Sequence, residues 1–233
     1  MLEQASGNPF RGKSVIVTGG SRGIGLATAR AFLAAGARVA LCARDPARLK
    51  NAEGELAGGE RLLARVADVS DPAQVRAFVQ EASHAFGALD VLVNNAGVLS
   101  VGPFAREPFE RMGAVIDVNL KGVMYVTRAL LPAMLERGEG VIVNVSSGAG
   151  LTGFAQIVSY CASKFGVVGF SAALDEEVRS AGVRVYALCP GRVATDMQIQ
   201  YSGARVGMPA ERVARRILAL AASKPRRCVV TLE

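Results

Sequence analysis

The chain is poor in the side chains that hydrolases and metal sites most often use. Its one histidine, His84, lies in the polar stretch QEASHAFG, and no nucleophile elbow occurs elsewhere. A Ser-His-Asp hydrolase would depend on that single imidazole, so this class of enzyme is disfavoured. The few cysteines are far apart and form no CxxC pair, which argues against a metal site and predicts buried, reduced thiols. They are Cys42, Cys161, Cys189 and Cys228.

Long hydrophobic runs are also missing. Arg128 interrupts the most apolar helical stretch, so no run of about eighteen apolar residues is left to cross a membrane. The first eleven residues, MLEQASGNPFR, lack the basic start and the apolar core of a signal peptide. We therefore expect a cytoplasmic protein without a membrane partner. Its 51% of hydrophobic residues are enough for a sizeable core and argue against disorder.

Positive charge is in excess, with a formal net charge of +7. Many of the arginines lie near the C-terminus, at Arg205, Arg212, Arg215, Arg216, Arg226 and Arg227. No aromatic residues alternate with them and no nucleic-acid motif accompanies them, so we expect no nucleic-acid partner. A solvated basic face accounts for the charge better, and an anionic cofactor is a second contributor to consider.

Short apolar runs alternate with helical periods along the whole chain. The runs rich in β-branched residues predict strands at 14–18, 38–43, 62–68, 89–94, 140–146, 183–188 and 228–232. Helical spacing predicts helices at 25–35, 46–56, 72–86, 109–137, 157–181 and 209–223. Strands that are apolar throughout and separated by helices predict a parallel sheet covered on both faces. We expect one α/β domain over 1–233, a Rossmann-like doubly wound sheet of seven strands, with a mobile substrate loop at about 196–208.

The first predicted strand runs into a glycine-rich turn, TGGSRGIG, which opens the first helix. Gly19, Gly23 and Gly25 allow the backbone to turn tightly and to approach a bound pyrophosphate beside the helix N–H groups. The spacing differs from GxGxxG, and an ordinary strand-to-helix turn is the alternative. A strand before it and a helix after it favour a dinucleotide site.

The end of the second predicted strand, ALCARD, bears on which dinucleotide binds. NAD-binding folds usually place an acid there for the ribose hydroxyls, whereas arginine suits a 2′-phosphate. Here Ala43 occupies the place of the acid and Arg44 follows it, with Arg22 in the glycine turn as a second charge. Asp45, followed by Pro46, is better explained as a helix N-cap. NADP(H) is therefore favoured over NAD(H).

The chain resembles the short-chain dehydrogenase/reductase family, in its compact single-domain branch, from about residue 12 to at least residue 196. Several motifs occur in the family's order: TGGSRGIG, ADV at 67–69, NNAG at 94–97, Asn119 in VIDVNLKG, NVSS at 144–147, YCASK at 160–164 and PGRVAT at 190–195. One such match would be weak, but the ordered set is specific. The resemblance implies an oxidoreductase that uses a nicotinamide dinucleotide.

The resemblance also implies a role for each matching position. The cofactor-binding residues would be Thr18, Gly19, Ser21, Arg22, Gly23, Ile24 and Gly25 in the turn, Arg44, and Asp68 and Val69 at the adenine. Asn95, Ala96 and Gly97 would support the ribose, with Pro190, Gly191, Val193 and Thr195 at the nicotinamide. The catalytic four would be Asn119, Ser147, Tyr160 and Lys164, of which Tyr160 and Lys164 also contact the cofactor.

Simple chemistry accounts for these residue types. Hydride delivery to a carbonyl leaves an alkoxide that needs a proton and a hydrogen-bond donor. The pKa of a free tyrosine is about 10, and an ammonium one helical turn away, Lys164, would lower that of Tyr160 toward neutrality. Ser147 could donate to the substrate oxygen, and Asn119 could tie a water to Lys164. As alternatives, Ser147 could be a strand-end cap, Asn119 a structural amide, and the Tyr–Lys pair a surface pair.

We expect an NADPH-dependent reductase of a ketone or aldehyde of modest size. The alternatives are an alcohol or sugar dehydrogenase that uses oxidised cofactor, and a catalytically silent cofactor-binding sensor or scaffold. Many family members end with a longer glycine-rich segment, whereas here the chain ends with RRCVVTLE, and whether that end is natural or truncated is left open. We expect a relatively open substrate site with Leu151, Phe154 and Ile157 as apolar walls. A homodimer through the two long helices, or the family's homotetramer, is the expected assembly.

Overall fold

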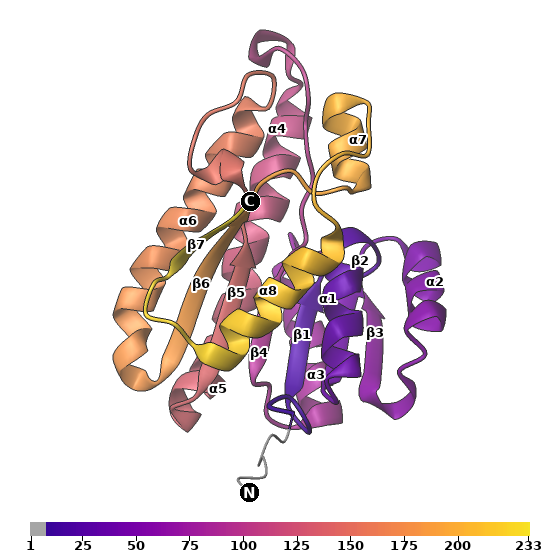
Figure 1. Ribbon diagram of the computed structural model, residues 1–233, viewed down its shortest axis with the longest axis vertical. Helices are drawn as coiled ribbons and strands as arrows, with labels where there is room; N and C mark the ends of the chain where they lie inside the picture. The colour runs from indigo at the N-terminus through magenta and orange to yellow at the C-terminus, as the bar shows by residue number, and fades with distance from the viewer. Residues whose placement is uncertain (1–7) are drawn as a thin grey trace, which may run out of the picture.

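The computed structural model describes residues 8–233; the first seven residues, part of the segment considered for a leader, lie outside the described residues. A seven-stranded sheet with the order β3-β2-β1-β4-β5-β6-β7 forms the centre of the molecule (Figure 1). All of its strand pairs are parallel. The strands are β1 (Ser14–Thr18), β2 (Arg38–Ala43), β3 (Leu62–Val66), β4 (Val91–Asn94), β5 (Gly140–Val145), β6 (Val183–Pro190) and β7 (Val229–Leu232). This confirms the predicted doubly wound α/β fold.

Helices cover both faces of the sheet. They are α1 (Gly23–Ala34), α2 (Pro46–Leu56), α3 (Pro72–Phe86), α4 (Phe109–Ile116), α5 (Gly122–Arg137), α6 (Val158–Val178), α7 (Asp196–Ser202) and α8 (Ala210–Ser223). Figure 1 shows α1 and α8 crossing one face, and the two helices pack against each other. Val15 and Val17 share a buried cluster with α1 and α8, whereas Ile16 between them shares one with α3 and α5. Both faces of the strand are therefore buried, which explains its unbroken apolar sequence.

Two predicted segments differ from the structure. The predicted helix 109–137 is interrupted by a π-helical turn, η3 (Asp117–Lys121), between α4 and α5, and Asn119 lies in that turn. The predicted loop 196–208 contains a helix, α7, whose first turn is capped by the Thr195 side chain at the Gln198 N–H. A helix of seven residues is too short to show a clear helical period, so the sequence pattern missed it. Of the four free cysteines, Cys228 is only partly buried, contrary to expectation.

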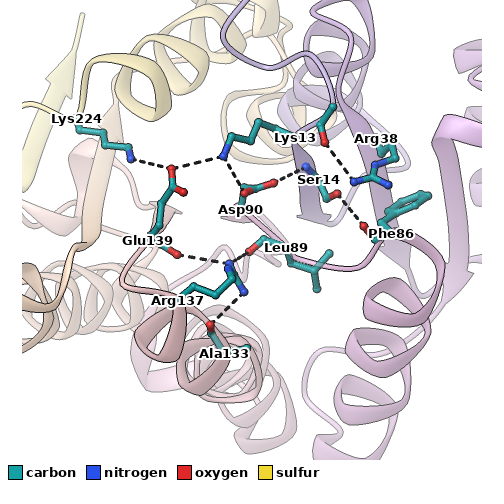
Figure 2. A network of polar contacts seen from close by, with 11 residues as sticks. Lys13, Ser14, Arg38, Phe86, Leu89, Asp90, Ala133, Arg137, Glu139 and Lys224 are labelled. Atoms are coloured by element: carbon teal, nitrogen blue, oxygen red, sulfur yellow. Dashed lines mark hydrogen bonds and ion pairs between the residues drawn. The ribbon is translucent and has the colours of Figure 1, made fainter.

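A network of charged groups lies where β1, β4 and β5 begin (Figure 2). Asp90 accepts hydrogen bonds from the Ser14 N–H at 2.8 Å and from Lys13 Nζ at 3.1 Å. Glu139 lies within 3.5 Å of the ammonium groups of both Lys13 and Lys224. These contacts connect the starts of three strands to the segment between α8 and β7. They leave the opposite, carboxyl edge of the sheet free for a site.

Two further findings concern the whole described chain. Within residues 8–233 no helix is both long enough and apolar enough to cross a membrane. The same residues contain no cluster of three or more histidine, cysteine, aspartate or glutamate side chains that could hold a metal ion.

The basic residues near the C-terminus include three arginines of α8. Arg212, Arg215 and Arg216 lie on the exposed face of this helix, as expected for a solvated basic face.

Candidate active site

A cleft of about 580 Å³ opens at the carboxyl ends of the strands, beside the glycine-rich turn. Asn95 holds this turn against the turn that follows β4: its Nδ2 donates to the Thr18 and Gly19 carbonyl oxygens at 3.0 and 3.1 Å. Gly25 packs so closely here that an added Cβ would lie 2.2 Å from the Gly19 oxygen. The glycine is therefore required by a contact between backbones, which a strand-to-helix turn alone would not need.

The start of α1 is open to the cleft. Its N-cap residue, Arg22, makes no side-chain capping bond, so the first N–H groups of this twelve-residue helix have no side-chain partner there. Gly19 and Gly23 have φ values of +64° and +55°, which glycine adopts without strain. Such a helix terminus suits the pyrophosphate of a dinucleotide. The residues present thus fit the cofactor that the resemblance implies.

Most of the predicted cofactor residues line this cleft. They are Gly19, Ser21, Arg22, Gly23, Ile24, Arg44, Val69, Asn95, Ala96, Gly97, Tyr160, Lys164 and Thr195. Thr18 and Gly25 do not line it and instead shape the turn: the Thr18 hydroxyl oxygen accepts from the Asn95 and Ala96 N–H groups. Asp68 does not line it either, and Pro190, Gly191 and Val193 line a second cleft.

Several arginines in the cleft are paired with carboxylates. Arg44 lies 3.6 Å from Asp68, and Arg48 lies 3.3 Å from Asp45. The Asp45 carboxylate also caps α2 as predicted, at 3.0 Å from the Ala47 N–H. Burial would raise the pKa of Asp68, but hydrogen bonds from Ser70 and the charge of Arg44 outweigh it, so that the pKa is lowered.

Arg22 was predicted to bind the cofactor, but in the structure its side chain pairs with a carboxylate of the protein. Its guanidinium donates to Asp196 at 2.8 Å, and Arg205 donates to the other oxygen of the same carboxylate. These hydrogen bonds lower the pKa of Asp196 and join the glycine turn to the first residue of α7. Sequence reasoning missed Arg48 and Arg205 as cleft residues. Arg48 could have been found, because it lies in the first turn of a correctly predicted helix that begins just after Arg44, whereas nothing marks Arg205.

The tyrosine and lysine of the opening turns of α6 are both buried, with exposed fractions of 8% for Tyr160 and 4% for Lys164. They do not form a surface pair. Lys164 Nζ lies 5.7 Å from the centre of the Tyr160 ring and donates to the Val145 carbonyl oxygen at 2.9 Å. The two side chains thus lie side by side at the end of β5, inside the cleft.

The pKa of Tyr160 is raised, whereas we expected it to be lowered. Burial raises it to about 12, although a hydrogen bond with Ser147 lowers it in part. Burial also lowers the pKa of Lys164 to about 8. The expectation considered the spacing of the two groups but not their shared desolvation, which disfavours both charged forms. Desolvation therefore dominates the pKa of both groups.

The two neighbouring serines have different surroundings. Ser146 donates to the Lys164 carbonyl oxygen at 3.0 Å and is buried. Ser147 accepts from the Ala149 N–H at 3.1 Å, which caps the 3-10 turn η4 (Gly148–Gly150), and it also lines the second cleft. The capping alternative is thus correct for Ser147 without excluding a contact with substrate.

Asn119 is engaged by protein groups on both sides of its amide. Its oxygen accepts from the Val98 N–H at 2.8 Å, and its nitrogen donates to the Val98 oxygen at 3.0 Å and to Ser163 Oγ at 3.1 Å. The π-helical turn thereby holds the segment after β4 against α6. This is the structural amide considered above, and the predicted link through a water to Lys164 stays a prediction.

A smaller cleft of about 230 Å³ adjoins the first one, and the lining residues common to both are Ile24, Ser146, Tyr160, Thr195 and Met197. Phe154 and Ile157 line it as predicted. Leu151 does not line it and is 42% exposed, so that prediction was wrong. The unpredicted helix α7 supplies further lining residues, namely Met197, Gln198 and Tyr201.

The class of protein follows from this arrangement: a doubly wound parallel sheet with a glycine turn, a dinucleotide-sized cleft and a buried Tyr–Lys pair defines a Rossmann-like oxidoreductase. The family model described as short chain dehydrogenase matches residues 13–205. The chain belongs to the short-chain dehydrogenase family. It is an oxidoreductase of the CH–OH/C=O type, in a family that uses NAD(H) or NADP(H).

Curated relatives and a solved structure agree with this assignment. The chain is 45% identical over 185 residues to the granaticin polyketide synthase putative ketoacyl reductase 1 of Streptomyces violaceoruber, covering 78% of this chain and 68% of the relative. It is 37% identical to the D-beta-hydroxybutyrate dehydrogenase of Cupriavidus necator, covering 90% and 83%. The crystal structure of levodione reductase superimposes with a TM-score of 0.89 at 30% identity, covering 96% of this chain and 97% of that one.

Proposed function

We propose that the protein is an NADPH-dependent reductase of small ketones or aldehydes. The observation that carries the cofactor preference is the end of β2, where Ala43 stands in place of an acid and the cleft is lined by Arg44 and Arg48. Two guanidinium groups suit the 2′-phosphate of NADPH, whereas NADH would offer only hydroxyl groups at that position. Both guanidinium groups also lie near a carboxylate, but they are about half exposed, and such exposed ion pairs are weak enough to give way to a phosphate. The relatives named as ketoacyl reductases support reduction of a carbonyl.

The bound cofactor would supply the hydride, and the residues of the chain would handle the charge that develops on the substrate oxygen. Tyr160 and Ser147 both line the small cleft, so a carbonyl oxygen placed there can receive a hydrogen bond from each. Tyr160 then gives its proton to the alkoxide. Burial raises the pKa of Tyr160 to about 12, so the phenol is protonated at neutral pH and can act as the proton donor. Lys164 would hold the cofactor ribose from the adjoining cleft.

The test is NADPH oxidation, followed by absorbance, with a panel of ketones and aldehydes. Tyr160→Phe is expected to lower kcat by 100-fold or more and to change the Kd of NADPH by less than threefold. Arg44→Ala is expected to weaken NADPH binding roughly tenfold more than NADH binding, because a charge-assisted hydrogen bond contributes about 1.5–3 kcal/mol. Arg179→Ala, at an exposed pair with Glu176, is the matched control.

The outcomes separate the alternatives. An active Tyr160→Phe variant would contradict the acid assignment, and equal losses of NADPH and NADH binding in Arg44→Ala would contradict the cofactor preference. Tight NADPH binding without turnover of any carbonyl would favour the sensor or scaffold. Faster oxidation of alcohols than reduction of carbonyls near pH 7 would favour the dehydrogenase.

The assembly and the location belong to the same proposal. Exposed apolar side chains on α4, α5 and α6, among them Phe109, Met124 and Phe165, support a homodimer through these helices. Light scattering after size exclusion measures the mass, and Phe165→Glu is expected to halve it. We also propose a cytoplasmic location and a substrate loop over residues 196–208.

A further inference from the structure

Arg192 is held at the edge of the small cleft by backbone contacts on two sides. The N–H of the preceding Gly191 donates to the Leu232 carbonyl oxygen at the end of β7, at 2.8 Å. The carbonyl oxygen of Arg192 itself accepts from the Met208 N–H at 2.9 Å, and an added Cβ on Gly207 would lie 2.4 Å from that oxygen. The long Arg192 side chain is exposed, but the backbone that carries it is held in place by these hydrogen bonds.

The charge of Arg192 stands alone in this cleft. Of the described residues that line it, Arg192 is the only charged one; the polar ones are Ser146, Ser147, Tyr160, Thr195, Gln198 and Tyr201. The described part of the chain contains no salt bridge to Arg192.

The cofactor cleft next to it shows the opposite pattern. All four of its arginines are paired with a carboxylate, as described above. A guanidinium beside a cleft that holds no carboxylate raises the local concentration of anions and can hold one by two parallel hydrogen bonds. A neutral carbonyl compound would make no use of this charge.

We propose that Arg192 binds an anionic oxygen group of the substrate, so that the enzyme reduces carbonyl compounds that also carry a carboxylate or a phosphate. The proposal rests on the proposed reductase function and names its substrate class. The carbonyl lies at Tyr160 and Ser147, and the anion lies at the cleft edge. In a small oxo acid the carboxylate lies within a few bonds of the reacting carbonyl. In a carrier-bound oxoacyl thioester the phosphates lie further from that carbonyl.

The experiment compares acids with their neutral methyl esters at saturating NADPH. The pairs are pyruvate, acetoacetate and levulinate with their methyl esters, which vary the distance between carbonyl and carboxylate. Acetoacetyl-CoA is the phosphate-bearing arm, with methyl acetoacetate as its neutral counterpart. The variants are Arg192→Ala, the conservative Arg192→Lys, and Arg179→Ala as the control at an exposed site.

In the wild type, at least one acid or the CoA thioester is expected to exceed its neutral counterpart in kcat/KM. Arg192→Ala should lower that charged-to-neutral ratio roughly 10- to 100-fold, mainly through KM, because a hydrogen bond to a charged group contributes about 1.5–3 kcal/mol. Arg192→Lys should restore part of the ratio, added salt should reduce it, and Arg179→Ala should keep it.

The outcomes distinguish the source of the anion and the failure of each proposal. A loss confined to the acids assigns a carboxylate, and a loss confined to the thioester assigns a phosphate. An equal ratio in wild type and Arg192→Ala overturns the role of Arg192 even if carbonyls are reduced. If no carbonyl is reduced, the reductase proposal fails, and calorimetric titration of the acids into the NADPH complex decides on Arg192. If the wild type and Arg192→Ala bind the acids with equal affinity, the role of Arg192 is rejected.

Discussion

Replacing Lys164 by methionine should raise the stability of the protein near neutral pH while removing a group that the proposed mechanism uses. Lys164 is 4% exposed, and burial lowers its pKa from 10.5 to about 8. Each pKa unit corresponds to about 1.36 kcal/mol, so keeping this ammonium in the folded state costs about 3 kcal/mol at pH 7. Methionine has a similar length and no charge, but it leaves the Val145 oxygen without its donor at 2.9 Å. That loss costs about 1–3 kcal/mol, so a net gain of about 1 kcal/mol is expected.

The dependence on pH is the sharper part of this prediction. Below pH 8 the lysine is protonated in both the folded and the unfolded state, so the full cost is present. Between pH 8 and 10.5 the folded state gives up its proton first, and the wild type gains stability as the pH rises. From pH 7 to 9.5 this gain amounts to about 2 kcal/mol for the wild type, and the variant lacks it. The advantage of Lys164→Met should therefore shrink and reverse over that range.

Urea unfolding followed by far-UV circular dichroism measures this difference, since the sequence has no tryptophan to report by fluorescence. Protein concentration is held constant because assembly would shift the transition. Lys50→Met, at an exposed position of α2, is the control and should show no such slope. A Lys164→Met variant that is less stable than the wild type by the same amount at every pH would refute the reasoning, because it would mean that the ammonium is not desolvated.

Two further substitutions test the supports of the site. Gly25→Ala places a methyl group 2.2 Å from the Gly19 oxygen, so NADPH binding measured by fluorescence titration should weaken at least tenfold while circular dichroism stays native. Alanine at Gly54, where an added Cβ meets nothing within 4 Å, should leave binding as it is; equal effects would contradict the close contact. Asp90→Ala leaves the buried N–H of Ser14 without its acceptor and should lower the free energy of unfolding by about 1–3 kcal/mol, with kcat retained. A variant as stable as the wild type would show that water replaces the carboxylate.

The strands and the glycine turn could be predicted because their signals are local. β1 and β2 have the predicted bounds, since each is a run of apolar residues buried on both faces. The first positions of α2 and α3 could be predicted because Asp45 and Asp71 cap them, each followed by proline. In such segments the local sequence carries enough signal to predict the element.

The parts of the site that escaped prediction depend on contacts between distant residues. α7 is attached through Asp196 to Arg22, 174 positions away, and no local pattern records that contact. Asn119, in the π-helical turn, forms hydrogen bonds with both backbone groups of Val98, and the helical period of 109–137 does not reveal this contact. Leu151 illustrates the same limit: its apolar character is visible in the sequence, but in the structure it is 42% exposed and lies outside the small cleft.

The buried pair of α6 shows how burial changes the meaning of a motif. The spacing of Tyr160 and Lys164 brings phenol and ammonium together, and in water that proximity would favour both charged forms. Desolvation acts on both groups in the opposite sense and dominates here, raising the pKa of the first and lowering that of the second. Lys164, with a pKa of about 8, is then the member of the pair that titrates closest to neutrality. Under the proposed mechanism, a change of activity near pH 8 would accordingly report the loss of the Lys164 ammonium, whereas Tyr160 would stay protonated.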